Sequence, residues 1–200
     1  MAGIEFRDGE LLVERAPSEL DTLAIEFSSL LGNAGIQHVY VAGYVAILSG
    51  RPRATQDIDV LIERCGEPTV EALVDELQAA DFWGPAMPLS NAYELLSNGD
   101  NIWVAREDEM APHLELKFAD DEFDRASLEN AITARIDDSE IPIGPLELQI
   151  AYKLYLEARK DFEDAVHLYT MFEDGLNIEK LESWVRKLGV EEEYDRLKRA

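Results

Sequence analysis

Residues 39–62 read VYVAGYVAILSGRPRATQDIDVLI, and this stretch decides the fold that we expect for the chain. A β-rich run over 38–42 ends at a glycine turn, and a short helix is predicted over 44–49. Residues 57–62 are predicted to form an apolar strand that contains Asp57 and Asp59. Side chains at positions i and i+2 of a strand point to the same face, with Cα atoms about 7 Å apart. The two carboxylates are therefore expected to lie side by side.

Two neighbouring carboxylates on one strand face suggest a metal site. Burying them costs free energy unless cations neutralise them, and oxygen ligands suit hard divalent cations such as Mg²⁺. Glu115 lies between two leucines within a predicted strand over 113–118, so it could supply a third carboxylate from a neighbouring strand. Three such groups suit a two-metal site that clamps a phosphoryl transfer. The alternative is an exposed edge strand whose acids are solvated.

The rest of the chain alternates predicted helices and strands. We expect helices over 17–33, with Ser18 as the cap, and over 68–80, and strands over 101–105 and 113–118. Residues 82–100 follow no clear pattern, and 141–145 mark a boundary before helices over 145–158, 161–173 and two shorter ones after Asn177. The sequence thus predicts an α/β (α+β) fold. An α/β domain over 1–144, with a mixed sheet flanked by helices, precedes a C-terminal helical unit over 145–200.

The composition is strongly acidic. The 200 residues include 42 acidic and 18 basic side chains, a formal net charge of −24, and the acids are spread along the whole chain. Such self-repulsion destabilises a compact state unless salt screens it, so we interpret the pattern as halophilic adaptation and expect the fold to need salt. The single cysteine, Cys65, excludes an internal disulfide framework. No apolar run approaches a membrane span, and the N-terminus lacks signal-peptide features, so a cytoplasmic location is expected.

The segment Arg51-Pro52-Arg53-Ala54-Thr55-Gln56-Asp57-Ile58-Asp59 resembles a family signature. Together with the preceding glycine turn it is similar to the DNA polymerase β-like nucleotidyltransferase superfamily. The minimal bacterial and archaeal members, which read V-G-G-x-A and then R-P-R-x-T-x-D-I-D, are closer still. Ala42 stands where the first glycine is usual and Val45 where alanine is usual. The resemblance implies a nucleotidyltransferase fold in which Asp57, Asp59 and Glu115 hold two Mg²⁺ ions. It also implies that a nucleoside triphosphate is bound by Gly43, Tyr44, Arg53 and Thr55.

A second resemblance lies downstream. The runs Leu146-Glu147-Leu148-Gln149-Ile150-Ala151-Tyr152-Lys153-Leu154 and Arg159-Lys160-Asp161-Phe162-Glu163-Asp164 are similar to those of AbiEii/MenT-type nucleotidyltransferase toxins. By this match Lys153 would contact the nucleotide phosphate, and Asp161 or Asp164 would orient the lysine or assist as a base. The alternative is a surface lysine followed by an ordinary helix cap.

The two resemblances together imply a function. It is Mg²⁺-dependent transfer of a nucleoside monophosphate to a hydroxyl of RNA, such as a tRNA end, or of a protein, in a toxin–antitoxin or defence system. Three alternatives remain open: an antitoxin that modifies its partner toxin, a non-catalytic nucleotide-binding protein, and a metal-dependent phosphohydrolase. The histidines lie on separate elements and are expected to be structural, and the tryptophans are expected to be core residues: His38, His113 and His167; Trp83, Trp103 and Trp184.

Overall fold

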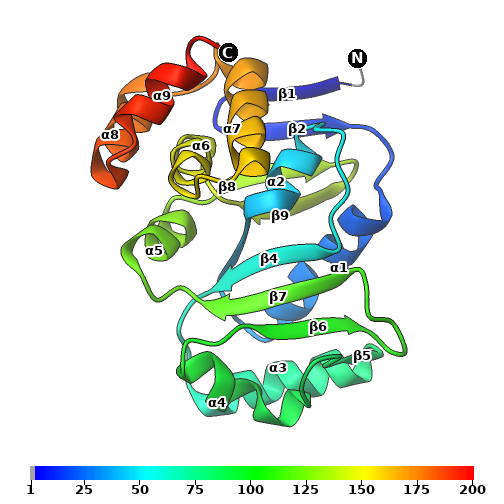
Figure 1. Cartoon of the computed structure of the whole chain (residues 1–200). Helices are drawn as coiled ribbons and strands as arrows, with labels where there is room; N and C mark the ends of the chain where they lie inside the picture. Colours follow the sequence, from blue (N-terminus) through cyan, green and yellow to red (C-terminus); the bar gives the residue numbers. More distant parts are fainter. Residues whose placement is uncertain (1–2) are drawn as a thin grey trace.

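The computed structural model describes residues 3–200, and over these residues the chain forms one nine-stranded mixed sheet and nine α-helices (Figure 1). The strands are β1 (Gly3–Arg7), β2 (Glu10–Glu14), β3 (His38–Val41), β4 (Asp57–Ile62), β5 (Phe82–Trp83), β6 (Ile102–Arg106), β7 (His113–Phe118), β8 (Ile132–Ile136) and β9 (Ser139–Ile143). The helices are α1 (Glu19–Asn33), α2 (Ala42–Leu48), α3 (Glu67–Ala79), α4 (Ala92–Ser97), α5 (Glu122–Glu129), α6 (Leu146–Tyr155), α7 (Arg159–Phe172), α8 (Ile178–Leu188) and α9 (Glu191–Leu197). A short 3₁₀ turn, η1 (Leu89–Asn91), precedes α4.

The sheet places β4 well inside its edges. The strand order is β1-β2-β8-β9-β3-β4-β7-β6-β5, so β4 pairs with β3 on one side and with β7 on the other. The β3–β4 pair is antiparallel, whereas the β4–β7 pair is parallel and needs the long crossover through α3, β5, α4 and β6. The alternative that Asp57 and Asp59 occupy an exposed edge strand is therefore wrong.

Most elements expected from periodicity are present. Ser18 caps α1 in a full capping box, because its hydroxyl accepts from the Asp21 amide while the Asp21 carboxylate accepts from the Ser18 amide. The β1–β2 and β8–β9 hairpins and α5 were not predicted. The unassigned stretch 82–100 holds β5, η1 and α4, and the expected boundary at 141–145 includes the end of β9.

The core lies mainly between the sheet and the helices. The apolar side chains of β4 that alternate with the aspartates, Ile58 and Val60, are buried in the main core, to which α1 and α3 contribute. A smaller apolar cluster joins α5 to β3 and β4 through Val39, Leu61 and Leu128. Within residues 3–200, no helix is long and apolar enough to cross a membrane.

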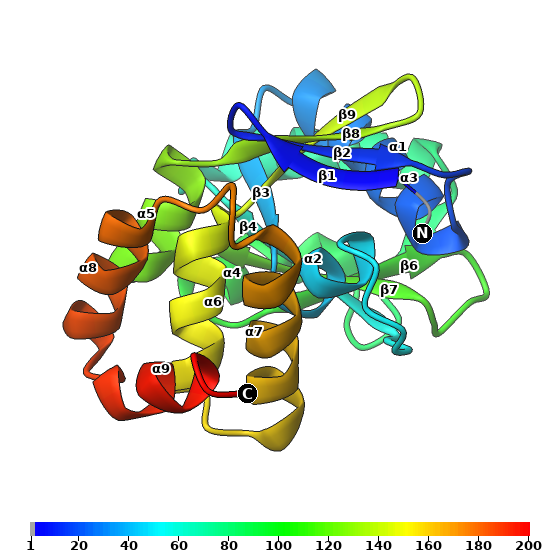
Figure 2. The same cartoon turned by 90° about the horizontal axis from the view of Figure 1, so that it is seen from above.

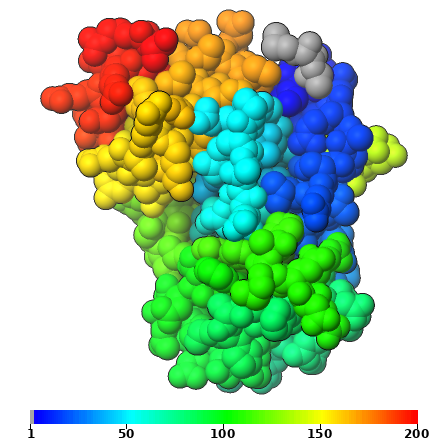
Figure 3. Space-filling view, turned by 45° about the vertical axis from the view of Figure 1, so that its right-hand side comes forward, coloured from blue at the N-terminus to red at the C-terminus, as the bar shows by residue number. Residues whose placement is uncertain are grey.

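The C-terminal helices pack beside the middle of the sheet. Figure 2 shows α6 and α7 side by side, with α2 next to α7 and α8 on the far side of α6, while α9 contacts both α6 and α7. In the space-filling view, the surface of the region around residue 100 lies directly below that of the segment around residue 50 (Figure 3). The loop with Arg51 and Arg53, which precedes β4, thus lies next to α7. Strands β6 and β5 lie beyond β7, on the other side of the strand that carries Asp57 and Asp59.

Candidate active site

The three expected carboxylates share one face of the sheet. Asp59 of β4 is directly in register with Glu115 of β7, and Asp57 precedes Asp59 by two residues. In-register partners on parallel strands point to the same face, about 4.8 Å apart along the hydrogen-bonding direction. All three side chains are half-buried, whereas Ile58 and Val60 point the other way into the core. Asp57, Asp59 and Glu115 thus lie on one face of the sheet, as the strand alternation predicts.

The negative charge of this face has its clearest effect on the pKa of Asp59. Burial raises the pKa of Asp59 to about 6, with additional contributions from the negative charges of Asp57 and Glu115, while Lys153 and Lys160 act in the opposite direction. Burial alone would also raise the pKa of Asp57. There, however, the Thr55 hydroxyl, which donates to Asp57 Oδ1, and further contacts hold the pKa below its usual value. The face therefore holds negative charge that a cation would relieve.

The carboxylate oxygens are the kind of ligand that magnesium prefers, but they are not arranged as a preformed metal site. Among residues 3–200, no three acidic, histidine or cysteine side chains are arranged as a preformed metal centre. Glu115 accepts a hydrogen bond from Asn101 Nδ2 at 3.2 Å, and Asp57 is held by Thr55. Magnesium is commonly bound by one or two carboxylates plus water and substrate phosphate. Asp57 and Asp59, with Glu115 beside them, are the residues that could hold it.

The first residue of α2 has the backbone conformation that a glycine would supply. Ala42 has φ +58, the left-handed conformation that non-glycine residues rarely adopt, and its amide donates to Gln149 Oε1 at 2.8 Å. A Cβ added at Gly43 would lie 2.2 Å from the Arg53 guanidinium, so the end of this flexible side chain would have to move away from the turn. The departure at Ala42 therefore keeps the shape of the turn at the expense of local strain, and Gly43 lets Arg53 approach the backbone.

Tyr44 points away from this turn. Its side chain is fully buried, and its hydroxyl donates to Asp21 Oδ1 at 2.9 Å, which ties α2 to the start of α1. Burial, followed by the Asp21 charge, raises the pKa of Tyr44 well above its usual value. Only the backbone of Tyr44 is left for the nucleotide-binding role that the sequence resemblance implies.

A buried cluster of charges joins α6, α7 and the loop before β4. Lys153 Nζ lies 2.8 Å from Asp164 Oδ2 and 3.2 Å from Asp161 Oδ1, and all three side chains are buried. Asp164 also forms ion pairs with Arg51 and, at 3.4 Å, with Arg53. The two downstream motifs and the R-P-R loop therefore meet around one carboxylate. The alternative that Lys153 is an ordinary surface lysine is wrong.

The two neighbours of Lys153 on α6 differ in their surroundings. Leu154 packs in the main core, whereas Tyr152 lines a small cavity of about 70 Å³ that Lys153 and Phe123 also line. Lys160, at the start of α7, is exposed, yet its charge also lowers the pKa of both Asp57 and Asp59. The carboxylate face thus has positive groups on its α6 and α7 side.

Two of the tryptophans are not core residues, contrary to expectation. Trp83 and Trp103 are 36% and 37% exposed, whereas Trp184 packs partly buried against the core. His38 and His167 are structural as expected, since each ring bonds a neighbouring residue: the His38 ring meets Ser28 and the His167 ring meets the Ser49 carbonyl. The surroundings of His113 differ from those of the other two histidines. Its ring is buried next to Glu115 and stacks on Trp103, but neither ring nitrogen has a hydrogen-bond partner. Period-2 spacing on β6 and β7 could have located Trp103 and His113 on the carboxylate face.

Comparison with known proteins gives two informative structural matches. An antigenic nucleotidyltransferase-like protein from Paracoccidioides brasiliensis superposes with a TM-score of 0.55 and 18% identity, over 86% of this chain and 88% of that chain. The antibiotic-resistance factor ANT(2'')-Ia superposes with a TM-score of 0.51 and 15% identity, over 89% of this chain and 94% of that chain. The chain has the nucleotidyltransferase fold.

At this identity the likeness concerns the nucleotidyltransferase fold alone. No protein-family model matches the sequence, and no curated protein matches it either. Within the nucleotidyltransferase fold of this chain, the carboxylates of β4 and β7, the turn before α2 and the cluster on α6 and α7 come together from separate parts of the sequence.

Proposed function

We propose that the protein is a magnesium-dependent nucleotidyltransferase that moves a nucleoside monophosphate from a nucleoside triphosphate to an acceptor hydroxyl. The observation that carries this proposal is the pairing of Asp59 with Glu115 in register on central strands, with Asp57 beside them and Lys153 close enough to influence Asp59. In such a site a metal ion would balance the carboxylates, and the phosphates bound to that metal ion would balance the cationic side chains.

Each group has a role in the proposed transfer. Asp57, Asp59 and Glu115 would hold magnesium, which when bound supplies a Lewis acid for the phosphoryl oxygens. The acceptor oxygen forms a bond to the α-phosphorus, and the bond from that phosphorus to the oxygen bridging the β-phosphate breaks, so pyrophosphate leaves. The hydroxyl proton passes to a Glu115 oxygen. Gly43 and the backbone of Tyr44, with Arg53, would face the phosphates, and Thr55 holds Asp57 in place.

Lys153 fits a positioning role better than direct contact with phosphate. Both of its carboxylate partners, Asp161 and Asp164, are buried with it, and Asp164 in turn orients Arg51 and Arg53. Lys153 would thus hold two arginines at the nucleotide and offset the charge at Asp59. Asp161 would keep Lys153 in place.

The finer biological setting is also part of the proposal. The similarity of the Lys153 and Asp161 motifs to AbiEii/MenT-type toxins supports a toxin–antitoxin or defence role, with a tRNA end or a partner protein as the acceptor. An antitoxin that modifies its partner toxin has the same chemistry. The excess of acidic residues supports work in a saline cytoplasm.

Replacing Asp59 with asparagine tests the proposed transfer. The Asp59→Asn variant should lose at least about a thousandfold in transfer, because several kcal/mol of metal-dependent charge stabilisation are removed. The measurement is pyrophosphate release and incorporation of label from a triphosphate labelled at the α-phosphate, with a tRNA pool or a protein extract as acceptor, over a magnesium titration. Glu182→Gln on α8, an exposed acid outside the site, is the matched control and should match the wild type.

The products separate the alternatives. Release of inorganic phosphate in place of pyrophosphate would indicate a phosphohydrolase. Magnesium-dependent triphosphate binding without turnover would indicate a binding protein. Equal transfer by Asp59→Asn and wild type would sink the proposal.

A further inference from the structure

Both exposed tryptophans lie on the same sheet face as the carboxylates. Trp103 of β6 is directly opposite Glu115, which is in register with Asp59. Trp83 of β5 is opposite Ala105, in the neighbouring row that continues through His113 to Asp57. Directly opposed residues share a face, and three strand intervals from β4 to β5 span about 14 Å. An aromatic surface therefore extends from the carboxylates to the edge of the sheet.

The inner end of this surface is built and fixed. The Trp103 and His113 rings stack with centroids 4.4 Å apart and an interplanar angle of 24°. His113 is 7% exposed, its Nε2 lies 3.5 Å from Glu115 Oε1, and neither ring nitrogen has a hydrogen-bond partner. A buried imidazole without partners is costly in a finished interior. The imidazole is held beside Glu115 by its stack on Trp103.

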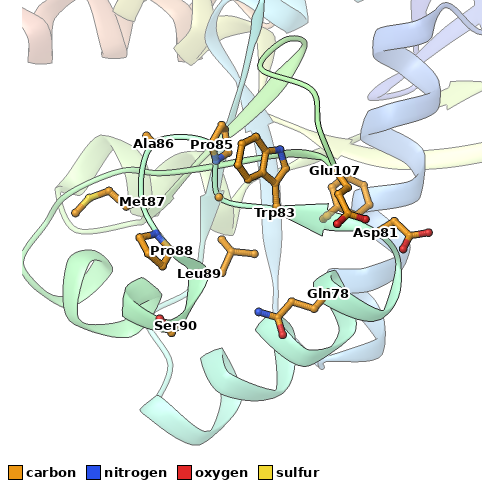
Figure 4. A pocket seen from close by; sticks show the side chains of 12 residues that line it. Gln78, Asp81, Trp83, Pro85, Ala86, Met87, Pro88, Leu89, Ser90 and Glu107 are labelled. Carbon is orange, nitrogen blue, oxygen red and sulfur yellow. The ribbon is translucent and has the colours of Figure 1, made fainter.

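The outer end of the surface is apolar and hollow. Trp83 Nε1 donates to the Glu109 carbonyl at 2.9 Å, which places the β6–β7 loop beside it, and Met110 follows Glu109 in this loop. Trp83 and Met87 line a cavity of about 630 Å³ next to β5, and Figure 4 shows their side chains with Pro85 around the loop that bounds it. We call Trp83, Met87, Trp103 and Met110 the aromatic strip. These four are among the most exposed large apolar side chains of residues 3–200.

The aromatic strip has acidic surroundings and almost no basic ones. Between positions 81 and 115, Arg106 is the only lysine or arginine in the sequence, and its guanidinium is paired with Glu26. The same stretch holds seven acids: Asp81, Glu94, Asp100, Glu107, Asp108, Glu109 and Glu115. The positive groups near the carboxylates belong instead to α6, α7 and the loop before β4.

Resting on the proposed function, we propose that the aromatic strip docks a positively charged protein segment whose serine, threonine or tyrosine hydroxyl is the acceptor. Exposed tryptophan and methionine are typical of protein interfaces, and charge complementarity with the acids selects a basic partner. A nucleic-acid acceptor needs cations for its phosphates, and the strip provides none. A single sugar ring would cover Trp103 but not the span to Trp83.

The transfer to such a segment is the one already described, with a defined product. The side-chain oxygen bonds to the α-phosphorus, pyrophosphate leaves, and the segment carries a nucleoside monophosphate in phosphodiester linkage. The hydroxyl proton passes to Glu115. The strip takes no part in bond making; it only holds the hydroxyl beside Glu115 and Asp59.

The test uses two synthetic copolymers and a tRNA pool as probes. Poly(Lys,Tyr) and poly(Glu,Tyr) both present tyrosine hydroxyls, but the first copolymer is positively charged and the second is negatively charged. Binding to the full chain is followed by fluorescence anisotropy of labelled probe, and transfer by label from an α-labelled triphosphate. Wild type should bind poly(Lys,Tyr) at least about tenfold more tightly than poly(Glu,Tyr) or tRNA. Trp103→Ala should weaken that binding about tenfold, while Ile178→Ala, which removes an equally exposed apolar side chain on α8, should not.

The outcomes separate this inference from the proposed function. Triphosphate binding by Trp103→Ala at wild-type strength, with lost copolymer binding, supports a docking role. Preferential binding of tRNA, or copolymer binding that Trp103→Ala leaves unchanged, overturns the inference even if nucleotide transfer is intact. Failure of the wild type to bind or consume any triphosphate overturns the proposed function. In that case, copolymer binding by the wild type and by Trp103→Ala still tests whether the aromatic strip is a docking surface.

Discussion

The carboxylate face has two sides of opposite character. On one side the charged groups of Lys153, Arg51 and Arg53 all lie within ion-pair distance of the buried Asp164. On the other side Trp103 is more than a third exposed, and the His113 ring nitrogens have no partner. We call these the basic side and the aromatic side.

The difference separates a scaffold from a docking surface. Buried, fully paired ions hold side chains in one geometry but contribute little net stability, so their use is positional. An exposed aromatic ring, in contrast, gains free energy when a partner covers it. The basic side therefore positions side chains, and the aromatic side is the surface that we propose as a docking site.

The largest effect is expected from breaking the basic side at Lys153. Lys153→Met should lower the free energy of unfolding by about 3 kcal/mol, because it leaves Asp161 and part of Asp164 as buried, unpaired charges. The double variant Lys153→Met/Asp161→Asn should recover part of that loss. Urea unfolding measures both, and Lys160→Met, an exposed lysine, should change stability by less than about 0.5 kcal/mol. If Lys153→Met unfolds like the wild type, the cluster is not a scaffold.

A somewhat smaller effect is expected at Asp59, between the two sides. Its pKa is raised from 3.8 to about 6, which corresponds to about 3 kcal/mol against the ionised form. Below about pH 4 the carboxyl is protonated both folded and unfolded, so the cost is absent. It builds up between about pH 4 and pH 6, where only the folded state still binds the proton, and is fully present above that range. Without divalent metal, Asp59→Asn should therefore be the more stable protein at pH 8 by roughly 2–3 kcal/mol.

The same comparison at low pH serves as the control for Asp59. The advantage of Asp59→Asn over wild type should shrink as the pH falls toward 4, and magnesium should stabilise only the wild type at pH 8. Thermal unfolding in buffers with chelator or magnesium gives both readings. An advantage that does not vary with pH would mean that packing, not charge, causes it.

The smallest effect per residue is expected from salt on the exposed acids. Each exposed charge interaction is worth only a few tenths of a kcal/mol, but the repulsion of a −24 chain is summed over many of them. The melting temperature should rise between about 0.1 M and about 3 M KCl as the Debye length falls. The loss caused by Lys153→Met should stay the same at both concentrations, since buried pairs are screened little. A melting temperature that ignores KCl would refute the halophilic interpretation.

Local sequence signals predicted the elements around the site but not the whole sheet. The alternation of Asp57, Ile58, Asp59 and Val60 is enough to predict a strand and its two faces. The β1–β2 hairpin escaped prediction although Asp8-Gly9, with φ +55 and +82, is a strong turn signal for a two-residue hairpin. The position of β4 inside the sheet depends on pairing with distant strands, which no local pattern encodes.

The residues of the candidate site were predicted where the local sequence pattern marks them, and they were missed where their placement depends on tertiary structure. Carboxylates in an apolar strand are conspicuous, and Lys153 and Asp164 were found through a resemblance. The burial of Tyr44 against Asp21 and the exposure of Trp103 depend on which helix covers which part of the sheet. Residue type alone favours a core tryptophan, and tertiary structure decided otherwise.

The long sequence separations in the site have a consequence for synthesis of the protein. Ala42 is held by Gln149, 107 residues later, and Arg51 is paired with Glu163, 112 residues later. A chain on the ribosome emerges from its N-terminus, so the strand with both aspartates is available long before α6 and α7. Until residue 164 has left the ribosome, Arg51 and Arg53 lack their shared partner. The growing polypeptide therefore carries the strand with both aspartates for a long part of its synthesis before the groups of α6 and α7 can pack beside it.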